Sequence, residues 1–144
     1  MSLRSTLLAV ALLGCAPTAA GDADALPGDG SSIVRIGEQV RLGGIAVWAL
    51  RLVEDSRCPA SVQCVHAGTV RLAIRIEQAG SSREAVLRLR EPEAAGGGRV
   101  LWLAGVCPLR EAPEPPLRAE DYRFMLATGR EGESAPPPPM CAPD

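Results

Sequence analysis

The chain of 144 residues contains no lysine and no asparagine, and His66 is its single histidine. All of its basic residues are arginine, which we attribute to GC-rich coding. The absence of lysine excludes Schiff-base chemistry and a P-loop lysine. One histidine excludes a three-histidine zinc site and a two-histidine blue-copper site within one chain. Most familiar catalytic sets therefore cannot be assembled from these residues, and the sequence predicts a protein that is not an enzyme.

Aromatic residues and net charge are also scarce. The aromatic residues are Trp48, Trp102, Tyr122 and Phe124. The core must come from aliphatic side chains, which bury less area per residue than rings, so covalent cross-links would help a domain of this size. The formal net charge of −2 gives no basic footprint for nucleic acid. We expect neither a nucleic-acid partner nor a cofactor.

The N-terminus has the layout of a secretory signal: Arg4, an apolar run over residues 7–13, and then small residues. The run is too short to span a bilayer as a helix. Leu12-Leu13-Gly14-Cys15 resembles a bacterial lipobox, in which the cysteine is lipidated and becomes the new N-terminus. This resemblance implies a signal peptide over 1–14, lipidation at Cys15 and, from Ala16, an outer-membrane lipoprotein of the cell envelope.

A competing interpretation is ordinary cleavage after Ala20 or Ala25, which would leave a soluble periplasmic or secreted protein. In either case residues 15–32 are rich in Ala, Gly, Asp, Ser and Pro and show no period. They are typical of a flexible tether.

Period-two alternation of apolar residues predicts an all-β domain over residues 33–128. The expected strands are 32–42, 45–53 with Trp48, Leu50 and Leu52 on one face, 69–78, 84–90, 99–106 and a last strand through Tyr122, Phe124 and Leu126. Residues 91–98 are expected to be a break, and the proline-rich segment 107–119 to run over an edge. This pattern predicts one antiparallel sandwich, or a small barrel, of about six or seven strands. The Pro-rich tail, 129–144, is too extended to pack a core.

Four cysteines remain after Cys15, and an even number in an exported chain indicates a disulfide framework. Three pairings are possible. We favour Cys58 with Cys64, which closes the loop between the second and third expected strands, and Cys107 with Cys141, which ties the tail back. In the chain-entropy model these closures contribute about 2.4 and about 3.8 kcal/mol.

Two chemical alternatives centre on His66. It could bind a metal with Cys58 and Cys64, with a fourth ligand from Glu54, Asp55 or Cys141, although C-x5-C-x-H is not a common zinc pattern and exported thiols tend to oxidise first. It could also act as a general base. The nucleophile would then be Ser56 or Ser61 and the orienting residue Asp55, but no nucleophile-elbow motif surrounds either serine.

The run D-S-R-C-P-x4-C-V-x-A-G over 55–68 resembles a segment of uncharacterised bacterial exported proteins and lipoproteins, which are small β-domains without a known activity. The resemblance covers about a tenth of the chain. The position of His66 is typically aromatic in that group, which implies a packing role for His66 here.

Most residues of this loop have structural explanations. Pro59 restricts the turn, Gly68 permits an unusual backbone angle, and Asp55 with Ser56 can cap local N–H groups. Arg57 can pair with Glu54 or Asp55. It could also be the primary contact of a serine-protease inhibitor, because a closed turn lowers the entropic cost of binding.

The favoured hypothesis is a non-catalytic module that binds an envelope macromolecule through its loops, as binding residues often lie on loops of rigid scaffolds. The candidate contact loop contains Arg57, Pro59, Val62, Gln63 and His66. The alternatives are the protease inhibitor acting through Arg57 and the metal-binding protein.

Overall fold

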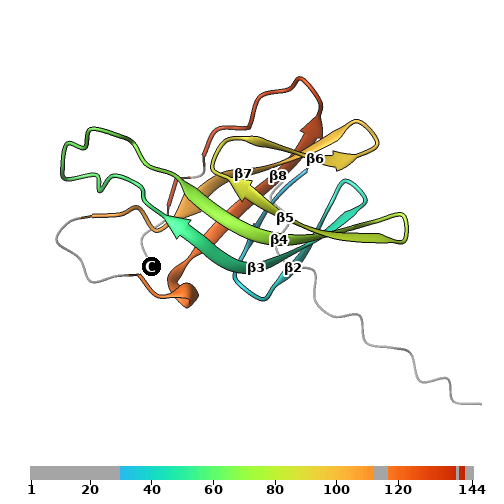
Figure 1. Ribbon diagram of the computed structural model, residues 1–144, viewed down its shortest axis with the longest axis horizontal. Coiled ribbons are helices and arrows are strands. Elements are labelled where there is room, and N and C mark those ends of the chain that lie inside the picture. Colours follow the sequence, from blue (N-terminus) through green and yellow to red (C-terminus); the bar gives the residue numbers. More distant parts are fainter. Residues whose placement is uncertain (1–29, 112–116, 139, 142–144) are drawn as a thin grey trace, which may run out of the picture.

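Two four-stranded antiparallel sheets make up the structure, a computed structural model that describes residues 30–111, 117–138 and 140–141 (Figure 1). One sheet has the order β1-β8-β7-β6 and the other β2-β3-β4-β5. A single 3-10 turn, Ala119–Asp121, is the only helical element in the described ranges. The all-β sandwich expected from the alternation is therefore confirmed. The strands are β1 Ser31–Val34, β2 Gln39–Leu42, β3 Ile45–Asp55, β4 Val70–Gln78, β5 Ser81–Arg88, β6 Pro92–Gly96, β7 Arg99–Cys107 and β8 Arg123–Arg130.

The core lies between the inner faces of the two sheets. In β4 the alternating residues Val70, Leu72, Ile74 and Ile76 are all buried in it, as the period-two pattern predicted. Aliphatic side chains dominate, since Tyr122 and Phe124 are the only aromatic members, and their rings stack with centroids 5.7 Å apart. The other members are Val34, Val40, Leu42, Ile45, Val47, Ala49, Leu87, Ala95, Leu101, Leu103, Val106 and Leu126.

Eight strands form where six or seven were expected, for two local reasons. The segment 32–42 is two strands in different sheets, because the chain turns at Gly37 (φ +87°), whose N–H donates to Ala49 O. The expected break at 91–98 contains β6, which pairs with β7. Pro92 opens β6 at the edge of its sheet, where a missing N–H is tolerated.

One facing assignment in β3 was also wrong. Ala49 is buried in the core, and the register with β4 shifts between Ala49 and Arg51. Because of this irregularity, Leu52 packs against the core, whereas Trp48 lies on the opposite face from Val47 and Ala49. A strict alternation cannot predict such a change of face.

The outer face of β7 and β8 carries a second apolar cluster, which contains Trp102 together with Val100, Ala104, Met125 and Ala127. Ala135 of the tail packs against this cluster, and Arg90 donates to the carbonyl oxygens of Ala135 and Pro136. The tail therefore covers an apolar surface, although its composition suggested that it was too extended to pack. The disulfide Cys107–Cys141 holds its end, with Cα atoms 5.5 Å apart.

Candidate functional site

The segment 56–69, here called the cysteine loop, joins β3 to β4 and projects beyond the ends of both sheets (Figure 1). The disulfide Cys58–Cys64 closes it, with a Cα–Cα distance of 5.9 Å, and the expected pairing of all four cysteines is confirmed. Two disulfides are typical of proteins that fold in an oxidising, extracytoplasmic compartment.

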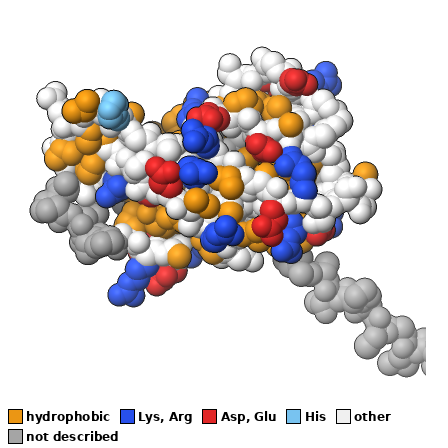
Figure 2. All heavy atoms as spheres, viewed as in Figure 1, with side chains coloured by type: hydrophobic (Ala, Val, Ile, Leu, Met, Phe, Trp, Pro, Cys, Tyr) orange, Lys and Arg blue, Asp and Glu red, His pale blue; other side chains and the backbone are white. Residues whose placement is uncertain are grey.

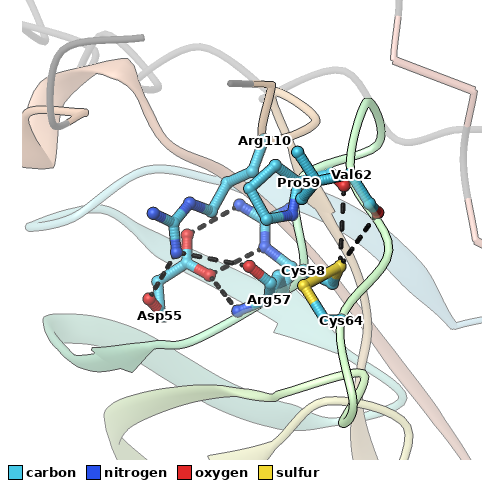
Figure 3. Close-up of a disulfide and its surroundings, with 7 residues drawn as sticks. All are labelled: Asp55, Arg57, Cys58, Pro59, Val62, Cys64 and Arg110. Atoms are coloured by element: carbon cyan, nitrogen blue, oxygen red, sulfur yellow. Dashed lines mark hydrogen bonds and ion pairs between the residues drawn. A yellow bond between two sulfur atoms is a disulfide. The ribbon is translucent and has the colours of Figure 1, made fainter. Parts of the chain in front are cut away.

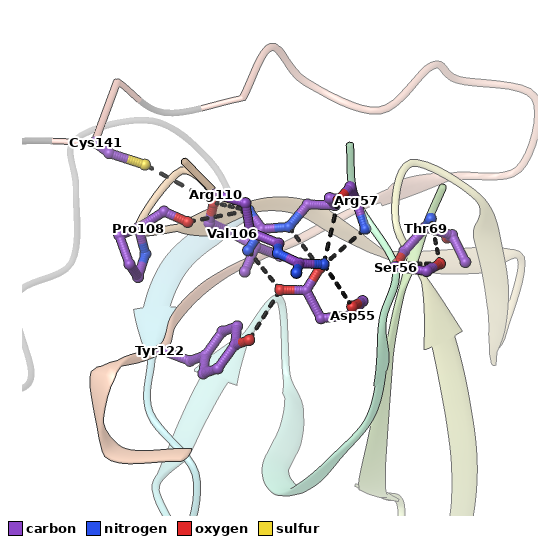
Figure 4. A network of polar contacts seen from close by, with 9 residues as sticks. All are labelled: Asp55, Ser56, Arg57, Thr69, Val106, Pro108, Arg110, Tyr122 and Cys141. Carbon is purple, nitrogen blue, oxygen red and sulfur yellow. Dashed lines mark hydrogen bonds and ion pairs between the residues drawn. The ribbon is translucent and has the colours of Figure 1, made fainter. Parts of the chain in front are cut away.

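A nearly buried carboxylate anchors the base of the loop. Asp55, the last residue of β3, accepts hydrogen bonds from Arg57 Nε at 2.9 Å, Arg57 Nη2 at 2.8 Å and the Tyr122 hydroxyl at 2.9 Å (Figure 4). The Arg57 and Asp55 side chains are only 12% and 6% exposed. The two-pronged arginine–carboxylate geometry is the strong form of this interaction.

Arg57 also ties the loop to the other sheet. Its Nη1 donates to the carbonyl oxygens of Val106 and Pro108, both at 3.1 Å. Arg110 reciprocates from the segment after β7, as its Nη1 donates to Asp55 O at 3.2 Å and to Arg57 O at 3.3 Å (Figure 3). One arginine from each segment thus satisfies main-chain carbonyls of the other.

Main-chain contacts complete the base. Ala60 N donates to Arg110 O at 2.8 Å, Ser56 N to Thr69 O at 2.8 Å and Cys58 N to Ala67 O at 2.9 Å. Gly68, at φ +70°, is required because a Cβ there would lie 1.7 Å from Ser56 O. The two limbs of the loop therefore approach too closely for any other residue.

The electrostatics favour a fixed ion pair. Burial raises the pKa of Asp55, but the hydrogen bonds from Arg57 and Tyr122 and the charge of Arg57 outweigh burial and hold it below its ordinary value. Burial, the hydrogen bond to Asp55 and the charge of that carboxylate raise the pKa of Tyr122 to about 12. Asp55 is therefore ionised and Tyr122 neutral across the physiological range.

The expected contact residues divide into two groups. Arg57 points into the base, and Pro59 is half-buried. Val62, Gln63 and His66 are exposed, so His66 does not take the packing role that the family resemblance implied. The expected pairing of Arg57 with Asp55 is confirmed, as is capping by Asp55, whose Oδ1 accepts from Arg57 N, and by Ser56, whose Oγ accepts from Thr69 N.

Sequence reasoning missed several residues of this region. Val65, 93% exposed, and Leu109, 58% exposed, present apolar side chains at and beside the loop. Tyr122 and Arg110 belong to the base although they are far from Asp55 in sequence. The scarcity of aromatic residues was the one signal that pointed to Tyr122, and no sequence pattern marked Arg110.

The metal alternative, and the general-base alternative in the form that uses Ser56, lack the arrangement that they need. Cys58 and Cys64 are bonded to each other, so neither sulfur is a thiolate, and the described residues contain no group of three His, Cys, Asp or Glu side chains placed to hold a metal. Ser56 Oγ contacts Glu54 Oε1 and Thr69 O, at 2.8 and 3.3 Å. The acceptors of the Ser56 hydroxyl are therefore these two oxygens, and neither of them belongs to an imidazole.

Comparisons with protein-family models, with curated proteins and with solved structures found no match. Within the described ranges, no helix is long and apolar enough to cross a membrane.

Proposed function

We propose that this protein is a non-catalytic binding module of the bacterial cell envelope, and that the outer surface of its cysteine loop contacts a macromolecular partner. The observation that carries the proposal is an exposed apolar surface on a braced support. Val65 is 93% and Val62 46% exposed on a segment that a disulfide closes. Figure 2 shows hydrophobic side chains gathered at the projecting end of the loop.

The chemistry of this surface suggests the kind of partner. No Asp, Glu or Arg occurs between Cys58 and Gly68, although charged residues make up 22% of the chain. Exposed apolar patches that are free of charge commonly mark contact sites for other macromolecules. The loop is therefore suited to an uncharged, apolar recess in an envelope protein.

Rigidity favours such binding, because a loop that is already ordered loses little entropy on association. The disulfide, the Asp55–Arg57 ion pair and the hydrogen bond from Ala60 N to Arg110 O restrict the loop before any partner arrives. The same contacts weaken the inhibitor alternative. Arg57 would have to leave two carbonyls and a carboxylate to enter a protease pocket.

We also propose that lipidation of Cys15 anchors the protein to the outer membrane. Residues 1–29 lie outside the described ranges, and the tether expected over residues 15–32 must end earlier, because Ser31 and Ser32 belong to β1. Support comes from the lipobox-like sequence and from the disulfides of the exported portion. Intact mass of the mature protein, before and after reduction, tests this placement. Acyl chains on an N-terminal Cys15 would support it, whereas a free N-terminus at residue 21 or 26 would exclude lipidation.

The contact surface is tested by site-specific photo-crosslinking in the native envelope from position 65, with position 86 as the control. Val86 is 38% exposed and lies on β5, away from the loop. We expect one partner to be captured from position 65 only. The purified partner should then bind the wild-type protein and Val86→Asp equally, and Val65→Asp at least about tenfold more weakly, a loss of about 1.4 kcal/mol. Equal capture from both positions, or none from either, would argue against the proposal.

A further inference from the structure

The end of the sandwich opposite the cysteine loop contains a pocket of about 790 Å³. The lining residues show this position, because they lie at the start of β7, at the end of β8, in the β2–β3 and β6–β7 turns and just before β1. These segments are at the opposite end of the strands from the cysteine loop. Pockets of this size at the mouths of β-barrels and sandwiches are common ligand sites. The lining residues are Gly30, Gly43, Gly97, Gly98, Arg99, Thr128, Gly129, Arg130 and Glu133.

Two arginines stand directly opposite each other in this pocket, because Arg99 of β7 pairs in register with Arg130 of β8. Directly paired residues of antiparallel strands point to the same face, and like charges there repel each other. Across the described ranges, neither guanidinium has an ion pair with an acidic side chain. The repulsion between the two arginines lowers the stability of the fold. The N–H donors of both guanidinium groups are available to bind a ligand.

Both arginines continue the inner faces of their strands. By alternation, Arg99 lies on the same face of β7 as the core residues Leu101 and Leu103. Arg130 likewise lies on the same face of β8 as Phe124 and Leu126. Where the core ends, the sandwich therefore presents arginine and glycine between its two sheets, in place of the aliphatic side chains that fill the rest.

The β2–β3 turn is shaped to admit one of the guanidinium groups. A Cβ at Gly43 would lie 2.3 Å from Arg99 Nη1, so a side chain here would displace the guanidinium from the mouth. At Gly97 and Gly98, whose φ angles are +62° and +70°, a Cβ would meet nothing within 4 Å, so the opposite rim is open. The glycines thus provide both room for Arg99 and open access for a ligand.

The pocket is positive overall. Two arginines and one glutamate line it, and the Glu133 Oε2 already accepts a hydrogen bond from Arg130 N at 2.8 Å. A guanidinium presents donors in a planar fork that matches the oxygens of a phosphate group. A tetrahedral oxyanion between the two guanidinium groups would relieve their repulsion and satisfy both.

We propose that this pocket binds a phosphate group through Arg99 and Arg130. The group is either free phosphate or the phosphate of a lipid headgroup. The lipid source rests on the proposed function, since a chain anchored at Cys15 joins the domain through Gly30, which lies in the pocket lining.

The full mature chain, with its disulfides intact, is titrated at constant ionic strength with inorganic phosphate, with monomeric short-chain phosphatidylglycerol or with the phosphate-free diacylglycerol of the same chain length. A rise in the thermal midpoint reports binding to the folded state. We expect saturable binding of phosphate or phosphatidylglycerol, and the tighter of these two probes identifies the source. Arg99→Gln and Arg130→Gln should each weaken this binding at least about tenfold, since each removes one fork of donors.

The matched control is Arg51→Gln, since Arg51 is an exposed arginine on β3 outside the pocket lining. It should bind as tightly as the wild type. Absence of binding by both anionic probes, or an equal loss in Arg51→Gln, would overturn the proposal. Binding that the phosphate-free diacylglycerol reproduces would overturn it as well, because the headgroup phosphate would then not be what is recognised.

Discussion

The two ends of the sandwich use arginine in opposite ways. At the cysteine-loop end, Arg57 donates to a carboxylate and to two main-chain carbonyls, and Arg110 donates to two further main-chain carbonyls, so that both arginines have their partners within the protein. At the glycine-lined end, Arg99 and Arg130 lie side by side on neighbouring strands at a pocket, and in the described ranges neither has an ion pair with an acidic side chain. The difference indicates that the first pair is a structural brace, and that the second pair is retained for a ligand.

Breaking the brace should have the largest effect on stability. We expect Asp55→Ala to lower the free energy of unfolding by about 3–5 kcal/mol, because it leaves the nearly buried Arg57 charge without its partner. Urea denaturation followed by tryptophan fluorescence measures the loss. Glu84→Ala is the control, since it breaks the exposed pair with Arg75 at 3.6 Å and should cost less than about 1 kcal/mol. Similar losses in the two variants would show that Asp55 is not a brace.

The disulfides come next. In the chain-entropy model, replacing Cys107 and Cys141 with serine costs about 3.8 kcal/mol, and replacing Cys58 and Cys64 costs about 2.4 kcal/mol. The tail variant should also increase the exposure of Trp102, because Cys141 holds the tail whose Ala135 packs against the cluster that contains Trp102. Denaturation midpoints and acrylamide quenching check both effects. The order of the two losses is the critical result, since a larger loss at the shorter loop would contradict the entropic account.

Much of the fold could be predicted from the alternation of apolar and polar residues, because an antiparallel strand with one buried face repeats its apolar residues every two positions. β4 and β8 show it most clearly. The features that were missed depend on tertiary context. Gly37 divides one apparent strand between two sheets, and Pro92 begins an edge strand in a segment whose glycines suggested only a turn.

The candidate site was predicted less completely than the fold. Cysteine number and spacing were enough to favour the correct pairing, and local capping by Asp55 and Ser56 followed from their residue types. Tyr122 lies 67 positions from Asp55, and Arg57 bonds to carbonyls about fifty positions away. Every residue type has a main-chain carbonyl, so residue types do not reveal which carbonyls Arg57 contacts. The inward direction of Arg57 could therefore not be predicted from the sequence.

The pH dependence of stability should originate at the braced end. Asp55 has a lowered pKa in the folded state, so its contribution is present above the unfolded value of about 3.9 and is lost as the pH falls through the folded value. Tyr122 has a folded pKa raised to about 12. Its contribution is present below the unfolded value of about 10 and is lost as the pH rises through the folded value.

Unfolding free energies measured across the acid and alkaline ranges test these assignments. Asp55→Asn should flatten the acid limb of the profile, and Tyr122→Phe the alkaline limb. An acid limb that is unchanged in Asp55→Asn would place the titrating group elsewhere.

The smallest expected effect lies at the glycine-lined end and has the opposite sign. Arg99→Gln should raise the free energy of unfolding by about 0.5 kcal/mol in the absence of phosphate, because it removes a like-charge pair across β7 and β8. Denaturation at low and high salt checks this, since screening should reduce the gain. A loss of stability at both salt concentrations would mean that Arg99 is also part of a brace.

The central claim is that the cysteine loop is held rigid while its apolar side chains stay exposed. Backbone ¹⁵N relaxation of the disulfide-intact protein tests it most directly. We predict order parameters of about 0.85 for the amides of Val62 and Val65, equal to those of rigid backbone. Values below about 0.6 would describe a flexible loop, and the account of a preformed contact surface would then be wrong.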